Sequence, residues 1–174
     1  MERRITKIKL KADLVVIQWQ QYQSLTKDWD SFAMSSKETP LPSFPEAMAA
    51  LAKHVEEICE LPEHSRDKIT VTGISHSYSL NNSYVVITAQ KELFTSRSPL
   101  NLNTPVKAME SDIDDDYGAS DEMVYDVEQL EQEAFNYIDG QRAQCLLSRF
   151  DGQKISDKIR ERGRKNGQTK SKNK

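Results

Sequence analysis

The sequence predicts a small α+β domain in which an antiparallel sheet of four to five strands carries two helices on one face. Two observations predict this class: apolar residues alternate around turn signals in both halves of the chain, and two segments have the apolar spacing of an amphipathic helix. The predicted order is β-β-α-β-β-α. A highly charged composition follows, so we place the α+β domain at 1–140 and a disordered basic tail at 141–174.

The first 43 residues predict two strands and a long loop. In residues 5–10, Ile and Leu alternate with Lys, which is typical of a strand with one buried face. Residues 13–22 begin with the apolar run from Leu14 to Ile17 and continue in alternation, which predicts a second strand. Serine pairs and prolines interrupt 24–43, so we expect a loop there.

A helix is predicted at 44–60. Ser43 and Glu46 fit a capping box, in which each side chain binds a free amide of the first turn. Pro45 lies in that turn, where its missing N–H costs nothing. The apolar stripe that would face the sheet consists of Phe44, Met48, Leu51, Val55 and Ile58.

A hairpin is predicted between residues 69 and 89. Apolar residues alternate on both sides of Asn81 and Asn82, which tolerate the positive φ of a tight turn. Gly73 interrupts the alternation and indicates a β-bulge. Residues 100–103 predict a further short strand before Pro105.

A second helix is predicted at 121–139. Asp121 and Glu122 lie in its first turn, where the helix dipole favours negative charge, and Gly140 is typical of a helix C-terminus. Its apolar stripe consists of Met123, Val127, Leu130, Ala134 and Tyr137.

Opposite charges are separated along the chain. Between Lys107 and Arg142 there are twelve acidic residues and no Lys or Arg, whereas from Arg142 onward eleven basic residues outnumber three acidic ones. Such asymmetry favours binding of a charged partner. The acidic stretch at 110–118 can also be neutralised by the protein's own tail, and the sequence leaves both interpretations open.

No motif in the sequence indicates catalysis or a resident metal or cofactor, so we expect a non-enzymatic protein with none of these. His54, His64 and His76 share no metal-ligand spacing, and no nucleophile or phosphate-binding signature occurs. Cys59 and Cys145 favour a reducing cytoplasm over a disulfide scaffold. No apolar run is long enough for a membrane helix, and no apolar segment typical of a secretory signal follows the N-terminus.

An acidic segment has some likeness to a calcium-binding loop. Counted from Asp112, the glycine of an EF-hand loop belongs at position six, where Tyr117 stands, and Gly118 follows at seven. The turn that would wrap an ion is therefore misplaced. A solvated acidic loop is the better interpretation.

Residues 144–150 contain a candidate docking segment. Gln144, Leu147 and Phe150 resemble the peptide with which replication factors bind sliding clamps, because two apolar side chains one helical turn apart fill a pocket while the glutamine reaches a polar site. A second aromatic residue is missing, since Asp151 occupies its place. The alternative is that Leu146, Leu147 and Phe150 pack a last helical turn onto the domain.

The tail also carries a candidate nucleic-acid-binding cluster. Such a segment can neutralise phosphates without reading sequence, and the basic strand at 5–10 could extend the same surface. The alternative is a solubilising tail. The cluster consists of Arg160, Arg162, Arg164 and Lys165.

A series of segments follows a recognisable order along the chain: Phe44 to Leu51 leading to His54, Ile69 to Gly73, Leu100 to Pro105, the acidic stretch, and Glu128 to Gly140. This order resembles an uncharacterised family of small phage and prophage proteins. The resemblance runs from about residue 5 to 150 and implies an early gene product encoded near DNA replication and recombination functions. It establishes no catalytic residues.

These observations favour an accessory protein of phage DNA metabolism that acts in the host cytoplasm by binding a protein, with nucleic acid as a possible second partner. The alternative is a counter-defence or host-takeover factor that binds a host protein through the acidic surface at 110–133. The oligomeric state, the strand order and the identity of the partner stay open.

Overall fold

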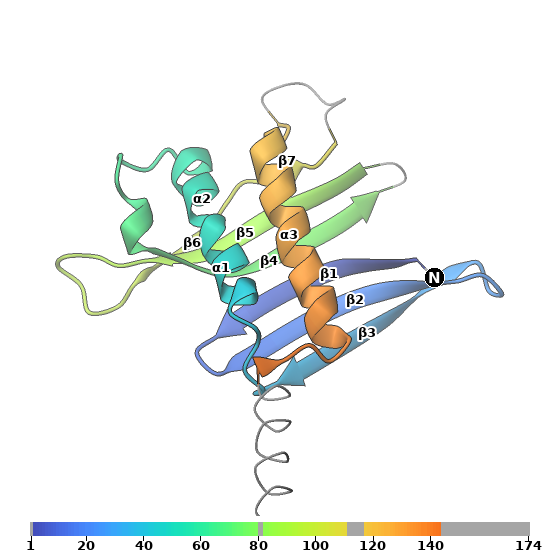
Figure 1. Cartoon of the computed structure of the whole chain (residues 1–174). Coiled ribbons are helices and arrows are strands. Elements are labelled where there is room, and N and C mark those ends of the chain that lie inside the picture. Colours follow the sequence, from blue (N-terminus) through green and yellow to red (C-terminus); the bar gives the residue numbers. More distant parts are fainter. Residues whose placement is uncertain (1, 80–81, 111–116, 144–174) are drawn as a thin grey trace, which may run out of the picture.

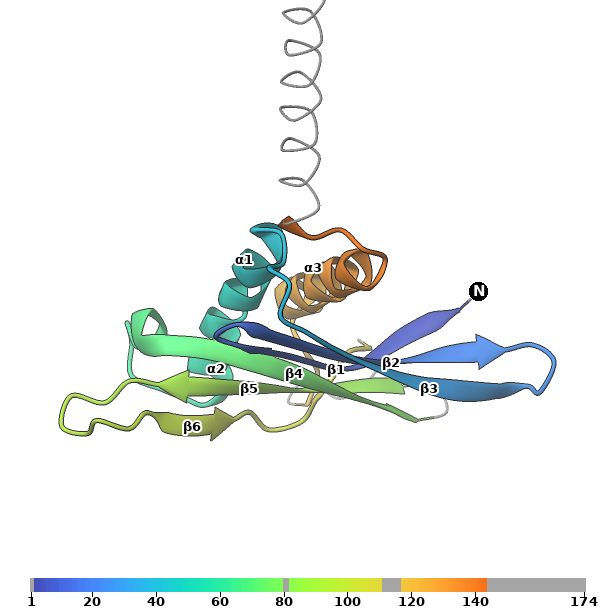
Figure 2. The ribbon, with the colours of Figure 1, turned by 90° about the horizontal axis from the view of Figure 1, so that it is seen from below.

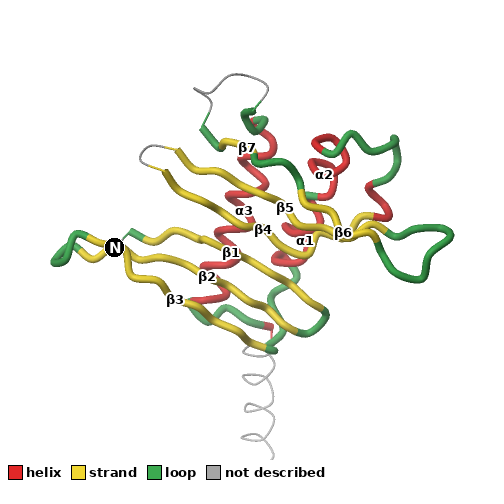
Figure 3. The backbone as a smooth tube through the Cα atoms, turned by 180° about the vertical axis from the view of Figure 1, so that it is seen from behind, coloured by secondary structure: helices red, strands yellow, loops and turns green. Residues whose placement is uncertain are grey.

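The computed structural model describes residues 2–79, 82–110 and 117–143. In this part of the chain a twisted antiparallel sheet forms one layer and helices form the other, which confirms the predicted α+β class (Figure 1). The helices all lie on one side of the sheet (Figure 2). Its opposite side carries no described helix, as the view from behind shows (Figure 3).

The sheet is larger than predicted. Its strands are β1 (Arg3–Lys11), β2 (Leu14–Gln23), β3 (Asp28–Ser36), β4 (Ile69–Ser79), β5 (Asn82–Lys91), β6 (Leu100–Asn103) and β7 (Lys107–Ala108). They lie in the order β3-β2-β1-β4-β5-β6, with β7 paired to β5, instead of the four to five strands expected. The strands at residues 5–10, 13–22 and 100–103 and the hairpin at 69–89 are confirmed.

Strand β3 corrects the loop predicted at 24–43. It pairs with β2 along its whole length, from Val15 opposite Ser36 to Gln23 opposite Asp28. As an edge strand it buries little, so polar residues interrupt its apolar ones and no clean alternation signals a strand. Trp29 and Phe32 nevertheless lie on opposite faces, each beside an aromatic residue of β2.

The helix predicted at 44–60 is divided in two. Helix α1 (Ser43–Ala50) and helix α2 (Ala52–Ile58) meet at Leu51, whose amide bonds back three residues to the carbonyl of Met48. The predicted capping box is wrong: helix α1 begins one residue earlier than expected, so Ser43 lies inside it. Its hydroxyl donates to the Glu133 carboxylate at 2.7 Å, which offers a charged acceptor on the neighbouring helix.

Helix α3 (Asp121–Ile138) matches the second predicted helix closely. The hydroxyl of Ser120 accepts the Met123 amide at its start, and Gly140 follows its end with a φ of +94°. Its stripe is buried against the sheet and α1, where Phe44 and Tyr137 meet ring to ring. A short 3-10 turn, η1 (Arg66–Lys68), leads into β4.

The bulge predicted at Gly73 is confirmed. The β4–β5 register shifts between Val71 and Gly73, and β1 approaches this point so closely that a Cβ on Gly73 would lie 2.4 Å from the Ile8 carbonyl oxygen. Glycine is needed here for space between two backbones rather than for an unusual φ.

Gly73→Ala should therefore destabilise the protein by about 1 to 3 kcal/mol, because β1 and β4 must move apart to admit the methyl group. Urea unfolding followed by circular dichroism measures this loss. Ser75→Ala on the same strand is the matched control and should change stability by less than about 0.5 kcal/mol. Equal stabilities for the two variants would contradict the tight contact.

Candidate nucleic-acid interface

The strand register divides the sheet into a buried and an open face. Residues directly opposite one another on neighbouring strands share a face. Ile8 lies opposite both Ile17 and Ile74, and Ile74 lies opposite Ile87, so these four isoleucines form one row under the helices. Each is at most 1% exposed. The positions between them point to the opposite side, which we call the open face.

The open face is basic along its central strand. Arg4, Lys7, Lys9 and Lys11 of β1 all point to this side, because their partners are the outward residues of β2. None of the outward strand positions among the described residues holds Asp or Glu. The polar residues at other outward positions of the sheet include Gln18, Gln20, Ser31, Ser35, Ser75, Ser77, Thr88, Gln90, Asn101 and Asn103.

An aromatic cluster adjoins one end of the basic row. The Arg4 guanidinium lies 3.8 Å from the Trp29 ring centroid and 4.4 Å from that of Tyr78, and its Nε donates to Gln20 at 2.9 Å. Tyr22 meets Trp29 edge to face at 5.5 Å. These contacts hold a cation and flat side chains in fixed positions at the edge of the open face.

The helix layer has the opposite charge. Helix α3 carries six acidic residues and no Lys or Arg, and α1 and α2 together add three acidic residues against Lys53 alone. An anion is therefore repelled from the helix layer and attracted to the open face. Half of the twelve acidic residues between Lys107 and Arg142 thus lie on α3, in the layer opposite the basic row of the sheet.

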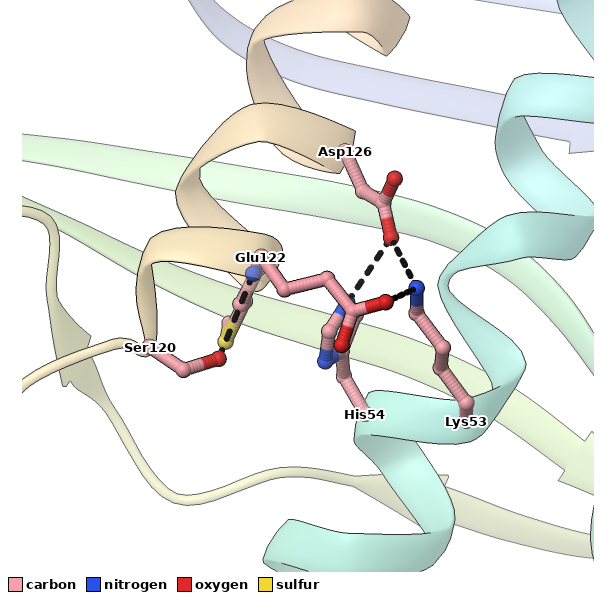
Figure 4. A network of polar contacts seen from close by, with 6 residues as sticks. Lys53, His54, Ser120, Glu122 and Asp126 are labelled. Carbon is pink, nitrogen blue, oxygen red and sulfur yellow. Dashed lines mark hydrogen bonds and ion pairs between the residues drawn. The ribbon is translucent and has the colours of Figure 1, made fainter.

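A polar network joins α2 to α3 at the acidic layer (Figure 4). One carboxylate oxygen of Asp126 lies 2.9 Å from both the Lys53 Nζ and the His54 Nε2, and Lys53 also binds Glu122. His54 is only 2% exposed and borders a pocket of about 570 Å³. A carboxylate that orients an imidazole is used in general-base catalysis, but here the same oxygen also binds Lys53, so we interpret the network as a link between helices.

Asp126 should make the free energy of unfolding depend on pH in the acidic range. Burial alone raises the pKa of its carboxyl group, but the hydrogen bonds from Lys53 and His54 outweigh burial and hold that pKa below the ordinary value. A carboxyl whose pKa is lower when folded stabilises the protein above the unfolded pKa of about 4. This contribution is lost as the pH falls through the folded value.

We expect Asp126→Asn to lower the free energy of unfolding by about 1 kcal/mol at pH 7. The difference from the wild type should shrink progressively below about pH 4, because the wild-type carboxylate then becomes protonated. Urea titrations across this pH range measure both values. A difference that stays constant with pH would show that the carboxylate charge does not link the helices.

The sequence-predicted site residues are placed as follows. Gln144, Leu147, Phe150, Arg160, Arg162, Arg164 and Lys165 lie outside the described residues, as do Asp112 to Asp116 of the acidic segment. The residues just before the docking segment contact the domain: Arg142 binds Glu38, and the Ala143 amide donates to the Thr39 carbonyl at 3.0 Å. Within the described residues no group of three side chains is arranged to hold a metal ion.

Sequence reasoning found only part of the open face. The alternation of Lys with Ile and Leu in β1 was visible, and it indicated a basic surface on the first strand. Trp29 was missed because its strand was predicted to be a loop. The contacts that Tyr22 and Arg4 make with Trp29 could not be predicted, because no strand was predicted at Trp29.

Comparisons with protein-family models, with curated proteins and with solved structures found no match for this chain. Within the described residues, no helix has the length and apolar character needed to cross a membrane.

Proposed function

We propose that this is a non-enzymatic accessory protein that binds single-stranded nucleic acid on its open face. The observation that carries the proposal is the row Arg4, Lys7, Lys9 and Lys11, which is free of acidic neighbours across the outward positions of the described sheet. Phosphates provide the sequence-independent part of nucleic-acid binding, and Lys and Arg neutralise them. The predicted role in phage DNA metabolism is compatible with this activity.

The arrangement of cations and rings on the open face suits a single strand of nucleic acid. Alternate residues of a strand are about 6.6 Å apart, so Lys7, Lys9 and Lys11 present a linear series of cations. A strand of nucleic acid laid across a sheet can place its bases on aromatic side chains, as sheet-based RNA-binding domains do. The Trp29 and Tyr22 pair lies beside the basic row and supplies such rings.

Two other parts of the proposal rest on the sequence. The basic cluster at 160–165 would add phosphate contacts, and Gln144, Leu147 and Phe150 would bind a protein partner. Both fit an accessory protein that brings a replication or recombination factor to a nucleic acid. The phage family and a cytoplasmic setting stay predictions of the same kind.

Salt titration of binding to a fluorescent oligothymidine tests the open face. Changing Lys7 and Lys9 together to Gln should weaken binding and reduce the slope of log K against log salt by about 1.4, because two phosphate contacts are lost. The control is Lys68→Gln, a single change of the same kind in η1, outside the open face. It should leave the slope nearly unchanged.

A second comparison separates the tail from the sheet. Changing Arg160, Arg162, Arg164 and Lys165 to Gln in the full chain removes the tail cluster and leaves the open face intact. If only this variant loses affinity, the tail binds and the open face does not. If the double variant of β1 binds as tightly as the wild type, our proposal for the open face is wrong.

A second candidate function is favoured by one exposed aromatic residue on the acidic layer. Tyr125 of α3 is 59% exposed and lies among Asp121, Glu122 and Glu128 on the same helix. An exposed ring surrounded by carboxylates suits a basic protein surface. This is the counter-defence alternative, in which the acidic surface at 110–133 binds a host protein.

The second candidate is tested by capture from host lysate followed by mass spectrometry. Tyr125→Ala should release a partner held by the acidic layer, while the folded stability should change by less than about 0.5 kcal/mol because the side chain is exposed. Phe94→Ala changes an aromatic residue that is 92% exposed and lies away from α3, and it is the control. Identical captured proteins from all three forms would exclude Tyr125 as a contact.

A further inference from the structure

A polar cavity of about 200 Å³ lies between α3 and the ends of β4 and β5 that meet at the hairpin. Its volume exceeds that of a single water molecule, which occupies about 30 Å³ in the liquid. His76 and Tyr78 come from β4, and Glu128 and Glu131 come from α3. The remaining lining residues are Ser83, Met109, Glu110 and Val124.

A buried imidazole in this cavity lacks a hydrogen-bond partner. The His76 side chain is 2% exposed, and its Nε2 makes no hydrogen bond within the described residues. Glu131 Oε1 is 3.3 Å away, which is close enough for an ion pair, but the geometry is not that of a hydrogen bond. Buried polar atoms almost always have a partner, so this arrangement calls for a group that serves both side chains.

The protonation states of these side chains allow the missing group to be a donor. Burial lowers the pKa of His76 to about 4, so the imidazole is neutral at pH 7 and can offer Nε2 as an acceptor. Burial, and next the neighbouring Glu128 charge, raise the pKa of Glu131 to about 7. A cation beside Glu131 would favour the charged carboxylate and lower this pKa.

Two carboxylates of the cavity come from α3. Within the described residues neither Glu128 nor Glu131 forms an ion pair with Lys or Arg. The Glu110 carboxylate accepts the Ser83 amide at 3.2 Å. Arg4 is the nearby cation, and it lies over the Tyr78 ring. The Tyr78 hydroxyl donates to the Ile5 carbonyl at 2.5 Å.

We propose that this cavity binds a primary alkyl ammonium group. An ammonium has three N–H donors and no acceptor, and it would find acceptors in the two glutamates and in His76 Nε2. The Tyr78 ring provides a surface for the alkyl chain and the positive charge. The ammonium can come from a free polyamine or from a lysine side chain of a protein partner, since both present the same chemical group.

Calorimetry and thermal unfolding of the full chain with putrescine and with Nα-acetyl-lysine amide test this site. The wild type should bind an amine and unfold at a higher temperature in its presence. Glu131→Gln should weaken binding about tenfold, because a charge-assisted hydrogen bond is lost. Glu46→Gln, which removes an exposed carboxylate of α1, is the control for general attraction of cations and should bind like the wild type.

Two further readouts distinguish ligand binding from a structural role. Glu131→Gln should unfold at the same temperature as the ligand-free wild type or higher, because a half-buried carboxylate without a Lys or Arg partner among the described residues is removed. Amine affinity of the wild type should rise between pH 6 and pH 8, as Glu131 loses its proton. Binding of putrescine alone identifies a polyamine site, and binding of the lysine amide alone identifies a site for a partner's side chain.

The inference is overturned by either of two results. One is that neither amine at millimolar concentration changes the unfolding temperature of the wild type. The other is that Glu131→Gln unfolds at a clearly lower temperature than the ligand-free wild type, which would show that His76 and Glu131 form a structural ion pair.

Discussion

The contact between β1 and β4 is the constraint on which the structure depends. Only three residue pairs join these strands, Lys7 with Ser75, Ile8 with Ile74 and Lys9 with Gly73, yet they hold together the β1–β3 and β4–β6 meanders. On the helix-covered face of the sheet, the isoleucine row continues across this contact from one meander to the other. On the opposite face, the same register places Lys7 and Lys9 at the centre of the open face. The core and the candidate interface are therefore two sides of one short strand contact.

Local patterns in the sequence predicted elements whose residues bury one clear face. The apolar stripe of α3, its start at Asp121 and its end before Gly140 follow from periodicity, the acidic first turn and the glycine alone, because these signals lie within one segment. Strand β3 escaped prediction since an edge strand exposes residues of every type. The break between α1 and α2 at Leu51 has no Gly or Pro to mark it. The hydroxyl of Ser43 binds the carboxylate of Glu133, which lies ninety positions later in the chain. Long-range partners of this kind cannot be deduced from local spacing.

The candidate sites show the same division. The lysines of β1 were visible as a periodic basic strand, but their isolation from acidic residues depends on which strands lie beside β1. Strand order was left open by the sequence, and the order found places the Ser- and Thr-rich side of β4 next to the basic row. His76 and Glu131 are 55 positions apart and belong to no motif, so only the packing of α3 on β4 brings them within 3.3 Å.

Tyr78 connects the two proposed binding sites physically. Past the three pairs that join β1 to β4, its hydroxyl reaches the Ile5 carbonyl, its ring lies beside Arg4, and the same side chain borders the cavity of Glu131. Glu131 and Arg4 act on Tyr78 in opposite directions: burial and then Glu131 raise the pKa of its hydroxyl, while Arg4 lowers it. A cation bound beside Glu131 would offset part of the negative potential that α3 exerts on this end of the sheet. At physiological salt such an effect reaches about 8 Å before it is screened. An anion on the open face would then be held more tightly, and by linkage the cation would be held more tightly as well.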